Sequence, residues 1–134
     1  MTKRRRTIDT TEEDQGRFAY GGLDRVLHEK ARLGIMTSLA TRPEGLLFSE
    51  LKRFCALTDG NLSRHLDVLR EAGLVEVWKG FENRRPQTLC RLSAEGRQRF
   101  VTYLEELEQV IRDAMPKAAK RERVPDLPPG FQPA

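Results

Sequence analysis

The stretch from Thr58 to Leu74, "TDGNLSRHLDVLREAGL", decides how the rest of the chain is interpreted. Its first three leucines recur at helical spacing and share one face at about 100° per residue. Thr58 is a good N-terminal cap, and Gly73 is typical of the residue that ends a helix. The stretch therefore predicts a helix over residues 58–72 that packs by one face and leaves the other uncovered.

The early turns of this helix carry side chains that can read base edges. Arginine pairs with guanine, asparagine with adenine, and serine with a base or a phosphate. A helix about 10–12 Å wide fits the major groove of B-form DNA. We predict base contacts by Asn61, Ser63 and Arg64, and phosphate or mixed contacts by Thr58, Gly60 and His65. A solvated polar surface, with His65 as a structural hydrogen bonder, is the alternative interpretation.

A predicted β-hairpin follows the helix. The segment "LVEVWKGF" alternates and is rich in strand-forming residues, "ENRRP" interrupts it, and "QTLCRLS" resumes the alternation. A basic loop beside a reading helix can follow the phosphate backbone or enter a minor groove. We therefore predict phosphate contacts by Lys79, Arg84 and Arg85, while a solvated hairpin tip is the alternative.

The flanking segments predict the remaining elements. Residues 23–42 fit two consecutive helices with a break near Glu29, and residues 46–48 fit a minimal strand. Ser49 is a plausible cap for a short helix through about residue 54, and Ser93 for a long helix that follows the hairpin. The predicted fold class is mainly α with a small β-hairpin, an α+β arrangement.

Two blocks, "NLSRHLDVLREAGLV" and "RRPQTLCRLSAEGR", carry a family resemblance. Over about residues 23–111 the chain resembles winged helix-turn-helix regulators of the MarR and ArsR type. The resemblance implies a DNA-reading helix at 58–72, a wing at 79–88, a long C-terminal helix and a homodimer joined by terminal helices. The dimer residues expected on this basis are Leu23, Val26, Leu27, Tyr103, Leu107, Val110 and Ile111. Because "ELKRFCAL" lacks paired cysteines, a metal-sensing role is not expected.

Length and composition set the domain organisation. The 134 residues suit one domain, and the net charge of +4 favours anionic partners. We predict a flexible basic and acidic arm over residues 1–20, including the run Lys3–Arg6, and a core over 21–115. Five of the seven prolines fall in residues 116–134, which are predicted to form a disordered tail.

Other kinds of site are not indicated. Cys55 and Cys90 lack a CxxC partner, so the sequence suggests no metal centre, disulfide or cofactor, and a reducing cytoplasm is the expected compartment. No apolar run approaches the roughly 20 residues needed to span a membrane. No nucleophile or carboxylate recurs around His65 at a suggestive spacing, so an enzyme is not expected.

These observations lead to one functional hypothesis and its rivals. The hypothesis is a sequence-specific, homodimeric repressor that reads an inverted repeat in double-stranded DNA. One rival is a winged helix that binds another protein instead of DNA. Another is a regulator that responds to a small-molecule effector or to thiol oxidation. RNA binding is a weaker rival, because the chain lacks an aromatic stacking platform.

Overall fold

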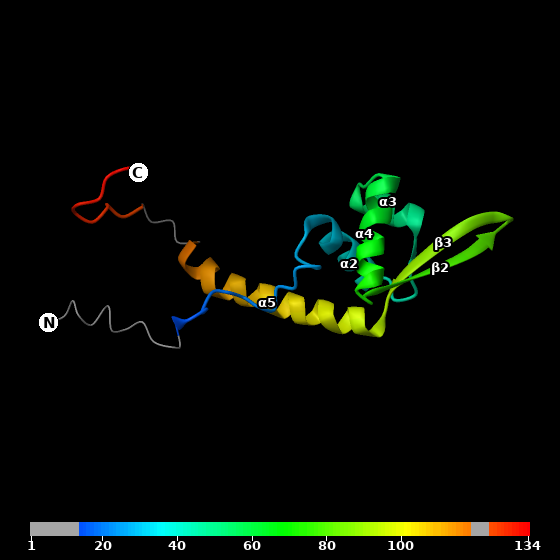
Figure 1. Ribbon diagram of the computed structural model, residues 1–134, viewed down its shortest axis with the longest axis horizontal. Helices are drawn as coiled ribbons and strands as arrows, with labels where there is room; N and C mark the ends of the chain where they lie inside the picture. Colours follow the sequence, from blue (N-terminus) through cyan, green and yellow to red (C-terminus); the bar gives the residue numbers. More distant parts are fainter. Residues whose placement is uncertain (1–13, 119–123) are drawn as a thin grey trace.

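The computed structural model describes residues 14–118 and 124–134. Three helices form the body, and Figure 1 shows the hairpin and the long last helix extending from it in opposite directions. The α+β class is confirmed, as is the winged-helix arrangement. The elements are α2 (Lys30–Ala40), β1 (Leu46–Leu47), α3 (Phe48–Cys55), α4 (Asp59–Glu71), β2 (Val75–Glu82), β3 (Arg85–Leu92) and α5 (Ala94–Ala118).

The sheet is antiparallel with the strand order β1-β3-β2. Cys90 on β3 pairs with Leu46 on one side and with Val77 on the other. Only Asn83 and Arg84 separate the long strands, and both have positive φ, at 51° and 67°. Two such residues define the tight turn whose twist matches a hairpin. The five-residue tip expected from "ENRRP" is therefore wrong, because its outer residues pair within the strands.

One apolar core joins the three body helices to the sheet and to the first half of α5. Its buried members are mostly leucines, together with one aromatic pair from α5 whose rings stack at 6.1 Å between centroids. The fully or nearly buried side chains are Leu27, Ile35, Met36, Leu39, Leu46, Leu51, Leu62, Leu66, Leu69, Leu74, Val75, Cys90, Leu92, Phe100 and Tyr103.

Two sequence-based expectations for the first half are wrong. Residues 21–29 form turns rather than a first helix, because the Asp24 carboxylate accepts the Val26 N–H and competes with a helical ladder. Glu29 is the N-cap of α2, where its side chain accepts the Arg32 N–H at 2.8 Å. The cap of α3 is Leu47 instead of Ser49, since Glu50 reaches back to the Leu47 N–H at 2.8 Å.

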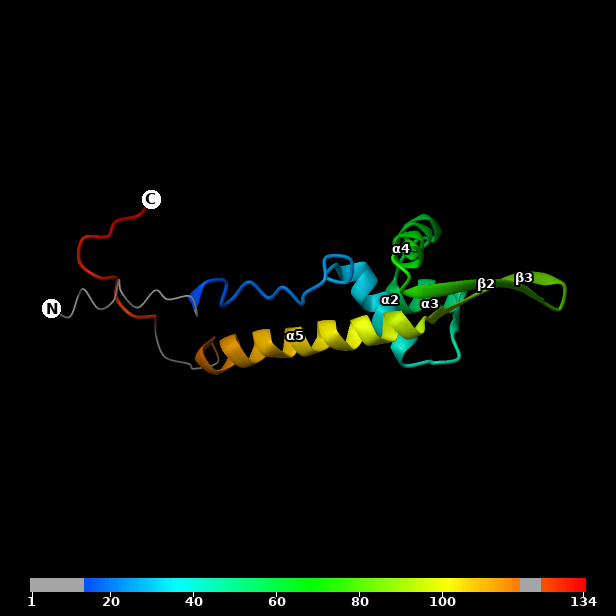
Figure 2. The same cartoon turned by 60° about the horizontal axis from the view of Figure 1, so that its bottom comes forward.

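The segment before α2 lies along α5, as the two views agree (Figures 1 and 2). The Tyr20 hydroxyl donates to Asp113 at 2.6 Å, and the Gly22 N–H donates to Glu106 at 3.0 Å. Tyr20, at the end of the predicted arm, thus contacts the long helix, while Lys3–Arg6 lies outside the described residues. At the other end, α5 continues through Pro116 to Ala118, three residues beyond the expected limit at 115.

Candidate nucleic-acid interface

Both ends of α4 are capped as the sequence predicts. The Thr58 hydroxyl accepts the Asn61 N–H at 3.1 Å. At the other end, Gly73 has φ +79°, its N–H donates to the Arg70 carbonyl, and the Leu74 N–H donates to the Leu69 carbonyl, both at 2.9 Å. This pair of bonds is the Schellman motif. The caps fix the length and direction of α4 within the body.

The outer face of α4 is uncovered. Asn61, Ser63 and Arg64 are exposed, as are Thr58 and Gly60, while the leucine face is buried. At about 100° per residue, Arg64 points most directly outward, and Asn61 and Ser63 flank it on opposite sides. The Asn61 carbonyl oxygen accepts a hydrogen bond from the Arg64 guanidinium at 3.3 Å. Asn61 therefore orients Arg64 and leaves its remaining donors free.

Two charged residues on this face were missed by the sequence analysis. Asp67 lies one turn beyond Arg64 and is held by Arg70, whose Nη2 is 3.1 Å from Oδ1 of the carboxylate. A groove of about 430 Å³ separates this part of α4 from the hairpin, and its lining includes Ser63, Lys79 and Thr88 besides this pair. The i,i+3 spacing of their opposite charges could have indicated this pair from the sequence, although such pairs usually mark only a solvated helix surface.

The basic residues of the hairpin lie at different distances from α4. Lys79 on β2 pairs with Thr88 on β3 and lies nearest to α4, at the groove. Arg84 occupies the turn, and Arg85 follows as the first residue of β3. All three side chains are exposed. The hairpin can therefore present positive charge from the edge of α4 out to the tip of the wing.

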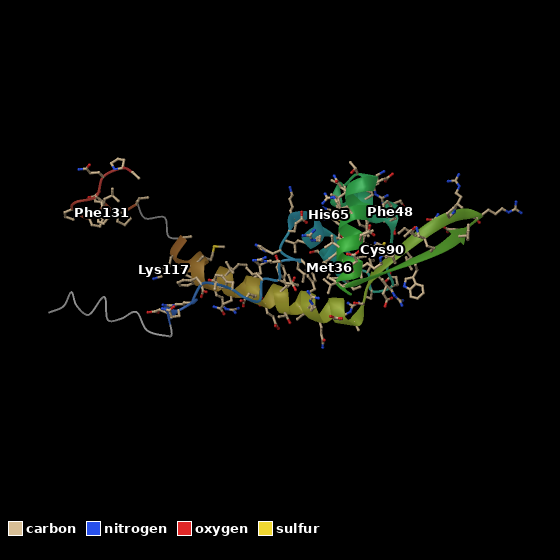
Figure 3. The ribbon with its side chains drawn as sticks, in the orientation of Figure 1. Met36, Phe48, His65, Cys90, Lys117 and Phe131 are labelled. Carbon is tan, nitrogen blue, oxygen red and sulfur yellow. The ribbon has the colours of Figure 1, made fainter. Side chains whose placement is uncertain are left out.

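His65 is the one predicted contact residue of α4 that is buried, at 5% exposure. Figure 3 labels His65 on α4. Its Nδ1 lies 3.2 Å from the Arg32 guanidinium, whose Nε donates to the Val26 carbonyl. The expected phosphate contact by His65 is wrong, because the ring is packed between α4 and α2. The contact supports the structural alternative, because it connects α4 to the start of α2.

The environment of His65 disfavours the protonated form of its ring. Burial lowers the pKa of His65 below its ordinary 6.5; Glu29 opposes this shift, and the positive charges of Arg64 and Arg32 add to it. An arginine donor facing Nδ1 also requires that nitrogen to be the acceptor. The contact with Arg32 therefore belongs to the neutral form of the histidine.

This burial predicts a pH-dependent stability. As pH falls through about 6.5, the unfolded chain binds a proton at this histidine at a higher pH than the folded chain does. The free energy of unfolding therefore decreases as pH falls. Wild-type protein is expected to lose more stability than His65→Gln between about pH 7 and pH 5. Urea unfolding at several pH values measures this difference. Equal pH slopes for the two proteins would contradict the assignment.

The expected dimer residues fall into two groups. The prediction that Leu27 and Tyr103 are dimer contacts is wrong, because both side chains are fully buried within one chain, at 0% and 1% exposure. The others keep free surface: Leu23, Val26, Leu107 and Val110 are half-buried and Ile111 is exposed. Sequence spacing could not separate these groups, since α5 packs its first half on the body and extends its second half beyond it.

The two cysteines differ in environment. Cys90 is buried in the core as expected, and burial raises the pKa of its thiol to about 11. Cys55 is half-buried, with its sulfur 3.6 Å from the Ser38 hydroxyl. Within residues 14–118 and 124–134, no group of His, Cys, Asp and Glu side chains is arranged to hold a metal. In the same part of the chain, no helix is long and apolar enough to cross a membrane.

Comparisons with known proteins place the chain in a family. Residues 31–111 match the winged helix DNA-binding domain family, and the chain belongs to that family. An uncharacterized protein of Methanocaldococcus jannaschii is 38% identical over 66 residues, covering 49% of this chain and 72% of the relative. The structure of a transcriptional regulator homologue from Pyrococcus horikoshii OT3 is 33% identical, with a TM-score of 0.63 over 67% of this chain and 88% of that one.

The fold is also that of MarR, whose structure is 24% identical with a TM-score of 0.56, covering 73% of this chain and 76% of MarR. The resemblance to MarR-type regulators is therefore confirmed for the winged-helix fold. The chain is a DNA-binding transcriptional regulator by family, which is not a class of enzymes.

Proposed function

We propose that this protein is a homodimeric repressor that binds an inverted repeat in double-stranded DNA. The observation that carries the proposal is the uncovered outer face of α4, with a basic wing beside it. In this scheme α4 enters the major groove and Arg64 reads a guanine. Asn61 orients the Arg64 side chain, and Ser63 contacts a base or a phosphate. The wing residues Lys79 and Arg84 neutralise phosphates.

The second copy is expected to pack on α5. Along α5, one face carries a row of apolar side chains that the chain itself leaves about half exposed. Such a row is costly to leave in water, and a homodimer would bury it against its own copy. The exposed members of this row are Val101, Leu104, Ile111 and Met115.

A selection experiment tests this function. Duplexes bound by the full-length protein are recovered from a random pool at two salt concentrations, and the mass of the protein is measured in solution. We expect a dimer and an enriched palindrome whose half-sites lie about 34–36 Å apart, one helical turn. Repression is then tested by placing the enriched site at a promoter. A monomeric mass with no enriched duplex would refute the proposal and favour the protein-binding rival.

The wing should contribute affinity without selectivity. Arg84→Ala and Arg85→Ala are each expected to weaken binding to all duplexes similarly and to lower the slope of log K against log salt by about 1. The reason is that a phosphate contact releases counterions whatever the sequence. Affinity titrations over a salt series measure the slope.

Lys117→Ala is the matched control for the wing variants. It removes the same charge at the far end of α5 from the wing (Figure 3). Its salt slope should equal that of the wild type. If the wing variants instead changed the preferred sequence, the wing would be reading bases and the assignment of its arginines to phosphates would be wrong.

A further inference from the structure

Four of the exposed side chains of α4 form two hydrogen-bonded pairs. The Asn61 carbonyl oxygen holds the guanidinium of Arg64, three residues later, at 3.3 Å. Arg70 likewise holds the carboxylate of Asp67, three residues earlier, at 3.1 Å. In each pair, one residue flanks the outer face and fixes a partner that lies closer to its centre. The second pair thus resembles the first and begins six residues further along the helix.

Asp67 occupies a place where a free carboxylate would be unfavourable. It is 60% exposed and lies about 45° from the line opposite the buried leucines. On a surface that meets DNA, a negative charge there is repelled by phosphates. Arg70 offsets part of that charge by binding Oδ1, and it leaves Oδ2 without a protein donor among the described residues. This oxygen can accept a hydrogen bond from a ligand.

The chemistry of the major groove selects one base for such an acceptor. Guanine presents two acceptors, and thymine presents an acceptor and a methyl group. Adenine presents an amino donor, but its N7 acceptor lies beside the donor and repels a carboxylate. Cytosine presents an amino donor without a neighbouring acceptor on the same base. A carboxylate directed into the groove therefore favours cytosine.

We propose that Asp67 determines specificity by accepting a hydrogen bond from a cytosine amino group. This inference rests on the proposed function, because it requires α4 to lie in the major groove. Three helical residues span about 4.5 Å, which is close to the rise of about 3.4 Å between base pairs. The cytosine read by Asp67 is therefore in a base pair next to the guanine read by Arg64.

Arg70 acts through Asp67 and is a positioning residue. It lies on the side of α4 that faces the wing, where it lines the groove with Lys79 and Thr88. Its guanidinium fixes the carboxylate orientation and adds positive charge where the DNA backbone would pass between helix and wing. Loss of Arg70 should thus affect the base read by Asp67 as well as overall affinity.

The experiment compares bound sequences from a pool of duplexes for wild-type protein and Asp67→Asn. Asparagine makes a bidentate pair with adenine, so the preference at one position is expected to change from cytosine to adenine by about tenfold. Asp67→Ala should lose that preference without gaining another. Arg70→Ala should weaken the cytosine preference while leaving the guanine position unchanged. Thermal melting confirms that the exposed substitutions leave the fold intact.

Glu105→Gln is the charge-matched control, since it removes one exposed carboxylate from α5 instead of α4. It should leave every base preference unchanged. If Asp67→Asn raised affinity for all duplexes equally, Asp67 would only repel phosphates, and the inference would be overturned. If wild-type protein selected a palindrome whose guanine depends on Arg64 but Asp67→Asn kept the same preferences, this inference alone would fail. Absence of any selected duplex would instead refute the proposed function.

Discussion

Gly96→Ala is expected to destabilise the domain by about 3 kcal/mol or more, because two backbone segments meet at this glycine. A Cβ on Gly96 would lie 1.9 Å from the Leu74 carbonyl oxygen and 2.7 Å from its carbonyl carbon. No rotamer change can relieve a contact with the main chain. The first turn of α5 would have to move away from the junction of α4 and β2.

The same junction is held by hydrogen bonds that this movement would strain. The Ser93 N–H donates to the Leu74 carbonyl at 3.0 Å, and the Ser93 hydroxyl donates to the Gly73 carbonyl at 2.7 Å. The Gly96 N–H in turn donates to the Ser93 hydroxyl at 2.9 Å, which confirms Ser93 as the cap of α5. These bonds connect the end of the reading helix to the long helix, so their loss should reduce cooperativity as well as stability.

Chemical denaturation followed by circular dichroism measures the effect. Gly60→Ala is the matched control, because a Cβ at Gly60 has nothing within 4 Å. In a helix this change is expected to stabilise by up to about 1 kcal/mol. A Gly96→Ala protein as stable as the wild type would show that α5 does not approach Leu74 as described.

Arg64→Ala is expected to have the largest effect on DNA recognition. It should cost about 1–3 kcal/mol on the preferred site and remove discrimination at one base position. The physical reason is that Arg64 is exposed at the centre of the outer face of α4 and is already oriented by Asn61. Its effect should therefore depend on the sequence of the duplex, unlike that of a phosphate contact.

Competition titrations with duplexes changed at single positions measure this discrimination. Arg53→Ala serves as a matched control on α3, where the guanidinium lies over the Phe54 ring at 5.2 Å. The control should leave the ranking of duplexes unchanged. If Arg64→Ala preserved the ranking too, α4 would not be the reading helix. Because Arg64 is exposed, thermal stability of the variant should match that of the wild type.

Local sequence signals determined α4 and its ends correctly. Thr58 and Gly73 act through hydrogen bonds to residues within five positions, and the buried face follows from leucine spacing alone. Such features depend on the neighbouring chain and can be recognised in any sequence. The same holds for the hairpin and for the burial of Cys90, which alternates with neighbouring strand residues. The resemblance to MarR-type regulators rested on these same segments.

Only the tertiary structure decided which surfaces stay free. The sequence placed His65 near the DNA and Leu27 and Tyr103 at a dimer interface, yet α2, α4 and α5 bury all three within one chain. Spacing along a helix shows which residues share a face, whereas burial depends on what other elements place against that face. Asp67 and Arg70 pair within α4 itself, but the position of this pair beside the wing depends on how α4 and the hairpin are brought together in space.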